Sequence, residues 1–231
     1  MSQVSHLAPL SGNKSGNQER RMKKIAIVAA LSIATLAVVA PTQASAAVKC
    51  TPTKAVGHQP LKTTPPQQAA KKLPTTLTLV TNCGTIVAKL DPKAPFTVTQ
   101  MAALVKAKYF DQSLCHRLAV RDFYMLQCGD PTATGTGGPG FTYTDENLPV
   151  NETSRYPAGT LAMANSGPNT NGSQFFLVFK DSGVLGPSYS VWGKITKGLD
   201  VLNYIGSLGV TDPSGVGAPK QRVAILKATV R

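Results

Sequence analysis

The residues best placed to hold a ligand lie in the stretch 159–179, which reads GTLAMANSGPNTNGSQFFLVF. Two apolar runs, 162–164 and 175–179, have the composition of β-strands. The residues between them are mainly Asn, Gly, Pro, Ser and Thr, and a loop of these turn formers holds backbone N–H and C=O groups out for a ligand. The spacing by itself predicts either such a binding loop or a plain hairpin with a long connection.

A second stretch, 115–147, places a permanently charged donor beside an apolar run; it reads CHRLAVRDFYMLQCGDPTATGTGGPGFTYTDEN. Arg117 carries a planar fork of N–H groups that stays charged at any ordinary pH. Its residue type fits a hydrogen-bond donor in a catalytic site. It fits equally well a surface ion pair with Asp122 or Asp130.

Two other literal matches in these stretches predict no function. Residues 135–140 satisfy the G-x-G-x-x-G pattern of dinucleotide-binding folds, but the run ends in Pro-Gly and no helix can follow it directly. His116, Asp130 and Ser173 could be combined into a hydrolase triad, yet the G-x-S-x-G elbow is missing from the sequence. We therefore predict neither dinucleotide binding nor hydrolysis.

Three motifs that occur in order across the two stretches resemble those of the cyclophilins, which are peptidyl-prolyl cis-trans isomerases. His116-Arg117 is followed by an apolar strand that ends in QCGD at 127–130, a Gly-rich run ends in DEN at 145–147, and the block 163–176 completes the set. The resemblance covers about 76–231. It implies a mainly β fold, a closed eight-stranded antiparallel β-barrel capped by two α-helices.

The resemblance implies that Arg117 is the catalytic residue. When the peptide bond is twisted, the prolyl nitrogen regains its lone pair, and a fixed donor there binds the transition state better than either ground state. An apolar pocket would grip the proline ring. Its walls would be Tyr124, Met125, Phe176 and Leu185, with Tyr189 at the rim. The carbonyl side of the substrate would be held by Gln127 and the backbone of Asn165, and the neighbouring groove would be lined by Ala164 and Ser166. Gln174 would orient Arg117 or the peptide. Each wall residue could equally be core. The expected substrates are proline-containing polypeptides, and no metal or cofactor is expected.

Several positions depart from the commonest pattern of the family. Tyr124 stands where Phe is usual, with two residues inserted between it and Arg117, while Tyr189 replaces a frequent His and Trp192 replaces Phe. Catalysis uses none of the replaced atoms, so activity should survive. Val184 stands where a Trp, when present, helps to bind cyclosporin, which leaves inhibitor sensitivity open. The rival function is a cyclophilin-like peptide-binding or chaperone module without turnover, because a fold does not settle a function.

The remaining elements follow from local patterns. The runs 77–80 and 85–90 predict a hairpin around the turn residues 82–84, and helical spacing predicts helices over 94–108 and about 199–207. Further strands are expected near 114–120, 123–128, 160–164, 174–179, 190–196 and 222–230. Short, numerous strands favour a mostly antiparallel β-domain that is closed to remove its edges.

The first 46 residues have the layout of a secretory signal peptide. Met22-Lys23-Lys24 precedes the uncharged apolar run 25–40, and Ala44-Ser45-Ala46 offers a small-x-small cleavage site. A membrane anchor is the alternative, but 16 apolar residues are short for a spanning helix. A lysine directly before Cys50 argues against lipid anchoring. We expect an exported chain that is secreted or associated with the cell envelope, without stable membrane insertion after cleavage, and Met22 is a candidate for the true start.

Residues 47–75 contain five Lys, five Pro and no acidic residue, which predicts an extended, disordered linker. The whole chain has a formal net charge of +13, whereas residues 76–231 have a net charge of only +4. A folded domain of that charge, without a basic stripe interleaved with aromatics, does not predict nucleic-acid binding. We expect a monomer.

The four cysteines, Cys50, Cys83, Cys115 and Cys128, all follow the predicted cleavage site. An even number of cysteines in an exported chain predicts disulfides. Strict strand alternation puts Cys115 and Cys128 on opposite faces, although a bulge would change that parity. The pairing stays open, and the spacings fit no zinc site.

Overall fold

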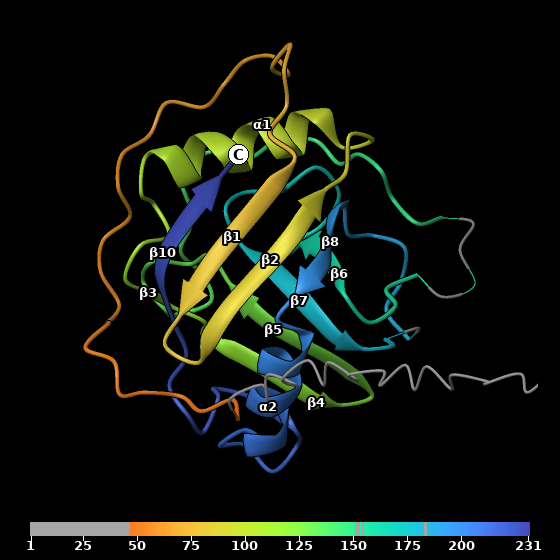
Figure 1. Cartoon of the computed structure of the whole chain (residues 1–231). Coiled ribbons are helices and arrows are strands. Elements are labelled where there is room, and N and C mark those ends of the chain that lie inside the picture. Colours follow the sequence, from red (N-terminus) through yellow and green to blue (C-terminus); the bar gives the residue numbers. More distant parts are fainter. Residues whose placement is uncertain (1–46, 151–152, 154, 183) are drawn as a thin grey trace, which may run out of the picture. The chain divides into compact units, whose positions relative to one another are not determined.

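The computed structural model describes residues 47–231 except 151–152, 154 and 183 (Figure 1). The described residues belong to one compact unit, Ser45–Arg231. The predicted signal peptide, its cleavage site and Met22 lie outside the described residues. Within the part that is described, every helix is too short or too polar to cross a bilayer.

The domain is built on one antiparallel sheet of ten strands that curls into a half-barrel (Figure 1). The strand order is β3-β10-β1-β2-β8-β6-β7-β5-β4-β9. The strands are β1 (Thr76–Thr81), β2 (Gly84–Leu90), β3 (Ser113–Leu114), β4 (Arg117–Arg121), β5 (Phe123–Cys128), β6 (Thr160–Met163), β7 (Phe175–Lys180), β8 (Val191–Lys197), β9 (Val216–Gly217) and β10 (Ala224–Val230). The predicted hairpin is β1–β2, and the other predicted strands are present with ends that shift by a few residues.

The prediction of a closed eight-stranded barrel is wrong. The two-residue strands β3 and β9 stand at the ends of the strand order, and no ladder joins them among the described residues. Cys115 and His116 separate β3 from β4, so the extended run 113–121 ends its pairing with β10 before it begins to pair with β5. The sequence indicated one strand here because an apolar pattern does not show where a strand changes its partner.

Two helices, α1 (Pro95–Lys106) and α2 (Leu199–Leu208), lie at opposite ends of the curled sheet (Figure 1). Pro95 stands at the start of α1, where its missing N–H is no loss. Gly209 ends α2 with a φ of 77°, a conformation that favours glycine. Helix α1 packs against β10, and α2 packs against β7, β2 and β5. Both predicted helices are confirmed.

Alternate side chains of the strands pack in two separate apolar clusters, one on each face of the sheet. The larger cluster fills the interior between the sheet and the helices, and it includes Leu118, Leu126, Leu161, Leu177 and Trp192. The smaller one, which we call the outer cluster, lies on the other face of β4, β5, β6 and β7 and consists of Ala119, Met125, Tyr156, Ala162, Phe176 and Val178. The outer cluster provides an apolar floor on the face of the sheet that looks away from the interior.

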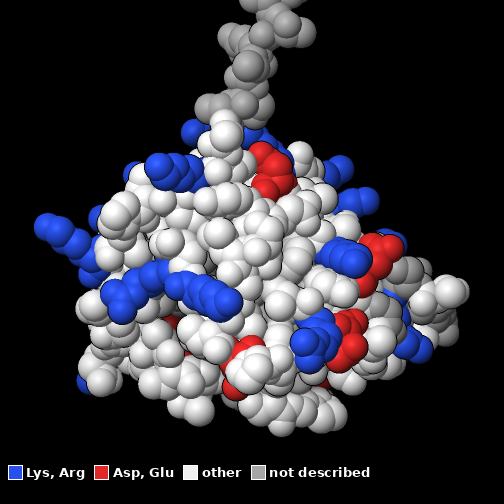
Figure 2. Space-filling view, turned by 90° about the horizontal axis from the view of Figure 1, so that it is seen from below, with Lys and Arg blue, Asp and Glu red and all other residues white. Residues whose placement is uncertain are grey.

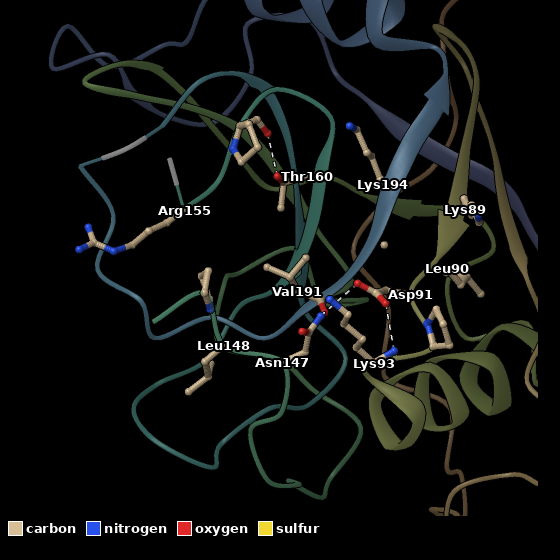
Figure 3. A pocket seen from close by; sticks show the side chains of 14 residues that line it. Lys89, Leu90, Asp91, Lys93, Asn147, Leu148, Arg155, Thr160, Val191 and Lys194 are labelled. Carbon is tan, nitrogen blue, oxygen red and sulfur yellow. Dashed lines mark hydrogen bonds between the residues drawn. The ribbon is translucent and has the colours of Figure 1, made fainter. Parts of the chain in front are cut away.

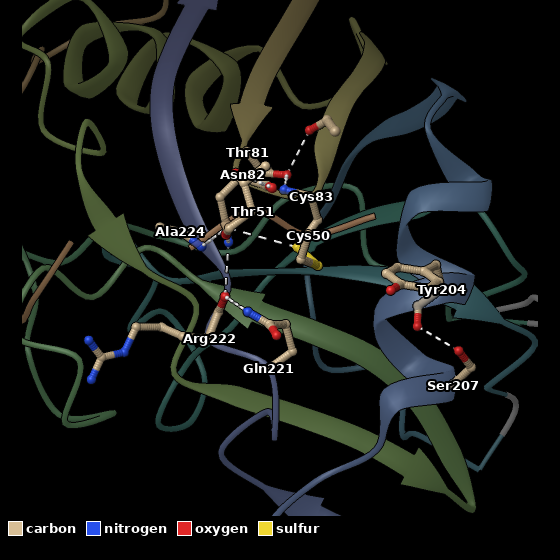
Figure 4. Close-up of a disulfide and its surroundings, with 11 residues drawn as sticks. Cys50, Thr51, Thr81, Asn82, Cys83, Tyr204, Ser207, Gln221, Arg222 and Ala224 are labelled. Carbon is tan, nitrogen blue, oxygen red and sulfur yellow. Dashed lines mark hydrogen bonds between the residues drawn. A yellow bond between two sulfur atoms is a disulfide. The ribbon is translucent and has the colours of Figure 1, made fainter. Parts of the chain in front are cut away.

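Residues 47–75, which we call the strap, contain no helix or strand, but they are not a free linker. At one end the disulfide Cys50–Cys83 ties the strap to the β1–β2 turn (Figure 4). Further along the strap, Gln100 Nε2 of α1 donates to the carbonyl of Pro66 at 2.7 Å. The prediction of a disordered linker therefore needs correction: the strap is extended and docked around the domain (Figure 1). Its composition indicated only that it buries little apolar surface, and a disulfide and backbone hydrogen bonds can dock such a segment.

The second disulfide joins Cys115 to Cys128. Strand alternation alone would have kept these residues apart. Cys115 lies in the break between β3 and β4, so the alternation of β4 does not extend to it. The two disulfides account for all four cysteines.

Candidate active site

Arg117 begins β4 and is paired across the ladder with Gln127 of β5. Its Nη1 donates to Gln127 Oε1 at 3.2 Å, and its Cζ lies 5.7 Å from the centroid of the Phe123 ring. The bond to Gln127 is the one hydrogen bond that the guanidinium makes within the described part of the chain. The remaining N–H groups of its fork can therefore donate to a ligand.

Gln127 is held in turn by Gln174. Gln127 Nε2 donates to Gln174 Oε1 at 2.8 Å, and Gln174 Nε2 donates to the carbonyls of Gly135 and Gly137 at 2.9 Å each. A side-chain amide has a donor end and an acceptor end, so the two glycine carbonyls decide which end of Gln174 faces Gln127. Gln174 therefore orients Arg117 through Gln127 and not by direct contact.

A cavity of about 120 Å³, with apolar and polar side chains in its lining, lies beside Arg117. Its lining residues are Arg117, Phe123, Met125, Gln127, Ala164, Asn165, Phe176, Leu185 and Tyr189. The outer cluster forms its floor, where Phe176 is only 3% exposed, and the ring of Tyr189 meets that of Phe176 edge to face at 5.4 Å. Residues from four separate segments thus converge around Arg117, as a binding pocket requires.

The prediction that Tyr124 lines this pocket is wrong. Its ring packs toward the interior against Phe179, with 6.0 Å between the centroids, and Phe123 lines the cavity instead. Asp122, with a φ of 63°, makes the bend between β4 and β5. Alternation back from Gln127 then places Met125 and Phe123 on the cavity face. That period of two was the signal in the sequence that could have identified Phe123.

A second and more open cavity, of about 680 Å³, adjoins the first. The two cavities share Gln127, Ala164 and Asn165, and the second also includes Ser166 and Gln174. Its opposite wall is the glycine-rich run 135–140. All the predicted site residues except Tyr124 therefore line one of two adjoining cavities.

The family model for "cyclophilin type peptidyl-prolyl cis-trans isomerase/CLD" matches residues 76–230. The chain belongs to this family. It is 43% identical over 161 residues to the "probable peptidyl-prolyl cis-trans isomerase B" of Mycobacterium tuberculosis, a match that covers 64% of this chain and 52% of that protein. The protein of the same name from Mycobacterium leprae is 42% identical over 173 residues, with 68% of this chain and 58% of that protein covered.

The chain thus spans little more than half the length of these curated relatives. Among solved structures, a cyclophilin type peptidyl-prolyl cis-trans isomerase from Cryptosporidium parvum is 29% identical with a TM-score of 0.59, and the match covers 68% of this chain and 97% of that one. The structure of the same protein in the presence of the dipeptide Ala-Pro matches with 28% identity and a TM-score of 0.59.

The loop that carries Gly135 and Gly137 in this cyclophilin is built around a buried carboxylate. Asp130 is fully buried and accepts hydrogen bonds from the backbone N–H groups of Thr132, Gly135 and Gly137 at 2.8, 2.7 and 3.1 Å. Burial alone would raise the pKa of Asp130, but the hydrogen bonds from Thr132, Gly137 and Gly135 outweigh it and hold the pKa below its ordinary value. Asp130 is therefore a structural carboxylate and not a proton donor at neutral pH.

His116, the neighbour of Arg117, is held in its neutral form. Burial lowers its pKa below the ordinary value of 6.5, the positive charge of Arg117 lowers it further, and Asp130 opposes both effects. Neither of its ring nitrogens has a hydrogen-bond partner among the described residues.

A third hollow, of about 470 Å³, shares no residue with the two site cavities (Figure 3). Four Lys or Arg residues contribute to its lining: Lys89, Lys93, Arg155 and Lys194. It contains none of the predicted site residues. In the described part of the chain no three His, Cys, Asp or Glu residues are grouped so that they could hold a metal ion, and independence from metals and cofactors stays a prediction.

Proposed function

We propose that this cyclophilin domain catalyses rotation about X-Pro peptide bonds. The observation that supports the proposal most directly is the guanidinium of Arg117, hydrogen-bonded to Gln127, at the edge of a cavity of about 120 Å³ with an apolar floor. The floor of this cavity consists of apolar side chains, against which the ring of a proline can pack.

The reaction changes no covalent bond. Rotation must cross a barrier of about 18–20 kcal/mol that comes from amide resonance, and uncatalysed X-Pro isomerisation takes tens to hundreds of seconds. In the twisted amide the prolyl nitrogen becomes a hydrogen-bond acceptor. A donor held at that position stabilises the twisted state selectively, and Arg117 supplies such a donor without any proton transfer.

The proline ring must be held while the rest of the peptide turns. Met125 and Phe176 form the floor for the ring, and Phe123 and Leu185 close its sides. The larger cavity beside Ala164 offers room for the neighbouring peptide residues. The related Cryptosporidium parvum structure that was solved in the presence of Ala-Pro supports a proline-containing peptide as the ligand.

We further propose that the substrates are exported proteins, whose folding the enzyme assists. Two disulfides favour an oxidising compartment, in agreement with the signal-peptide pattern of the first 46 residues. On the face shown in Figure 2, Lys and Arg lie at separate places with Asp and Glu between several of them. Charges of both signs are thus mixed on this face, which supports a peptide ligand and not nucleic acid.

A protease-coupled assay on a short X-Pro peptide tests the proposed activity. Ser45–Arg231 is a compact unit that contains the core and both disulfides, so it can be prepared by itself. We expect faster isomerisation than without enzyme, unchanged by EDTA. A rate equal to the uncatalysed one, combined with retained peptide binding, would support the rival function of a peptide-binding module.

The proposed export has its own test. N-terminal sequencing of the protein from culture medium and cell envelope should give a start at or near Ala47. Folded cytoplasmic protein that keeps Met1 or Met22 would contradict the proposal.

A further inference from the structure

We propose that the strap positions Arg117, so that Gly57 and His58, which line neither site cavity, act as positioning residues for the reaction. The inference rests on the proposed isomerase function. The strap precedes residues 76–230, which are the ones that match the family, so the family match does not account for it. A series of short contacts connects the strap to the guanidinium.

The first link fixes the beginning of the strap to the sheet. Besides the disulfide Cys50–Cys83, the backbone N–H of Thr51 donates to the carbonyl of Asn82 at 2.8 Å, and Asn82 Nδ2 donates back to the carbonyl of Thr51 at 2.7 Å (Figure 4). Asn82 is only 4% exposed, and its Oδ1 also accepts from the backbone N–H of Ala224 at 2.8 Å. The beginning of the strap is therefore held rigidly against β10 and the β1–β2 turn.

The second link joins the strap to the loop 130–137. The backbone N–H of His58 donates to the carbonyl of Pro131 at 2.8 Å. At Gly57 the strap comes so close to the loop that an added Cβ would collide with the carbonyl oxygen of Thr132. Ala55, just before this contact, is only 4% exposed. The strap thus presses against the loop at a place where only glycine fits.

The third link is the loop itself. The carboxylate of Asp130 accepts hydrogen bonds from the backbone N–H groups of Thr132, Gly135 and Gly137. Because one carboxylate binds all three groups, a displacement of Pro131 or Thr132 also displaces Gly135 and Gly137. Their N–H groups point to the carboxylate. Their carbonyls are the groups that accept from the side chain of Gln174.

The last link runs from Gln174 through Gln127 to Arg117, over distances of 2.8 and 3.2 Å. With Nε2 of Gln174 engaged by the two loop carbonyls, its Oε1 must face Gln127, and Gln127 must then present its own Oε1 to Arg117. A displaced loop frees Gln174 to turn over, which places a donor where Gln127 needs an acceptor. The orientation of the guanidinium is therefore set, in part, by the strap.

The variant Gly57→Ala tests this directly. We expect kcat to fall about 5- to 10-fold, because a small misplacement of a catalytic group is costly, while the Kd for peptide stays within about 2-fold. Val56→Ala is the matched control, because Val56 is the neighbouring residue and 58% exposed. In a Gln174→Ala background Gly57→Ala should have little further effect, since both changes act on one series of contacts. Additive losses would overturn the proposal.

A second readout does not depend on activity. Amide hydrogen exchange at Gly135 and Gly137 should become faster in Gly57→Ala but not in Val56→Ala. If the wild-type domain fails to isomerise peptides, the proposed function is wrong, and the exchange data still test the coupling. If Gly57→Ala does not fold, the pair Cys50→Ala and Cys83→Ala releases the strap without adding atoms and should change turnover and exchange in the same direction. Unchanged exchange at both glycines in the folded variant would refute the role of the strap.

Discussion

Replacing Arg117 with alanine removes the donor on which the proposed mechanism depends. Loss of one preorganised transition-state donor costs about 2.7–4 kcal/mol, which predicts a fall in turnover of about 10²- to 10³-fold. The loss should not be larger, because the cavity formed by Met125, Phe176 and Leu185 would still hold the proline ring. Peptide affinity should fall much less than turnover, since the ground-state amide nitrogen is a poor acceptor.

Folding should be nearly unaffected by the same change. The guanidinium is only partly buried, and the one hydrogen bond it makes within the described residues joins it to the neutral amide of Gln127 at 3.2 Å. Water can replace that bond, so the free energy of unfolding should change by less than about 1 kcal/mol. Arg117→Lys should recover little turnover, because a flexible ammonium does not reproduce the planar fork.

The protease-coupled assay gives turnover, isothermal titration with a proline peptide gives affinity, and urea unfolding gives stability. Arg121→Ala is the matched control, because Arg121 is an exposed arginine at the other end of β4. It should leave turnover within about 2-fold. If Arg117→Ala and Arg117→Lys reduced affinity and turnover equally, Arg117 would be a uniform binding residue and the twisted-amide role would be wrong.

Three further predictions concern other positions. Phe123→Ala should weaken peptide binding measured by titration, whereas Tyr124→Ala should lower stability by about 1–3 kcal/mol with turnover within about 2-fold; the reverse pattern would contradict the cavity lining described above. The pKa of His116 is lower in the folded state, so the unfolded state binds more protons below about pH 6.5, and stability should fall as the pH decreases, by at most about 1.4 kcal/mol per unit. His116→Gln should reduce that slope in urea unfolding at pH 7.5 and 5.5, and an equal slope in both proteins would refute the assignment. Val184→Trp should raise cyclosporin affinity and leave peptide turnover within a few-fold, because Val184 is 69% exposed and lines neither site cavity; unchanged inhibition would count against the match of this segment to the family.

Most secondary structure and most of the site could be predicted from the sequence because they depend on neighbouring residues. The β1–β2 hairpin needs only its turn residues, and α1 and α2 follow from helical spacing between clear end signals. Arg117 and Gln127 could also be predicted as site residues, since each belongs to a motif of adjacent residues.

The tertiary structure decided what depends on residues far apart in the chain. The period of two back from Gln127 puts Phe123 on the same strand face, but only the approach of Phe176 and Leu185, which are distant in the sequence, makes that face the wall of a cavity. The partner of Cys50 is 33 residues away, so nothing local in the strap indicated that it is docked. The sheet stays open between β3 and β9 because strand pairing is a property of two segments together. Local patterns thus determined the elements and the chemistry, while long-range contacts determined which side chains meet.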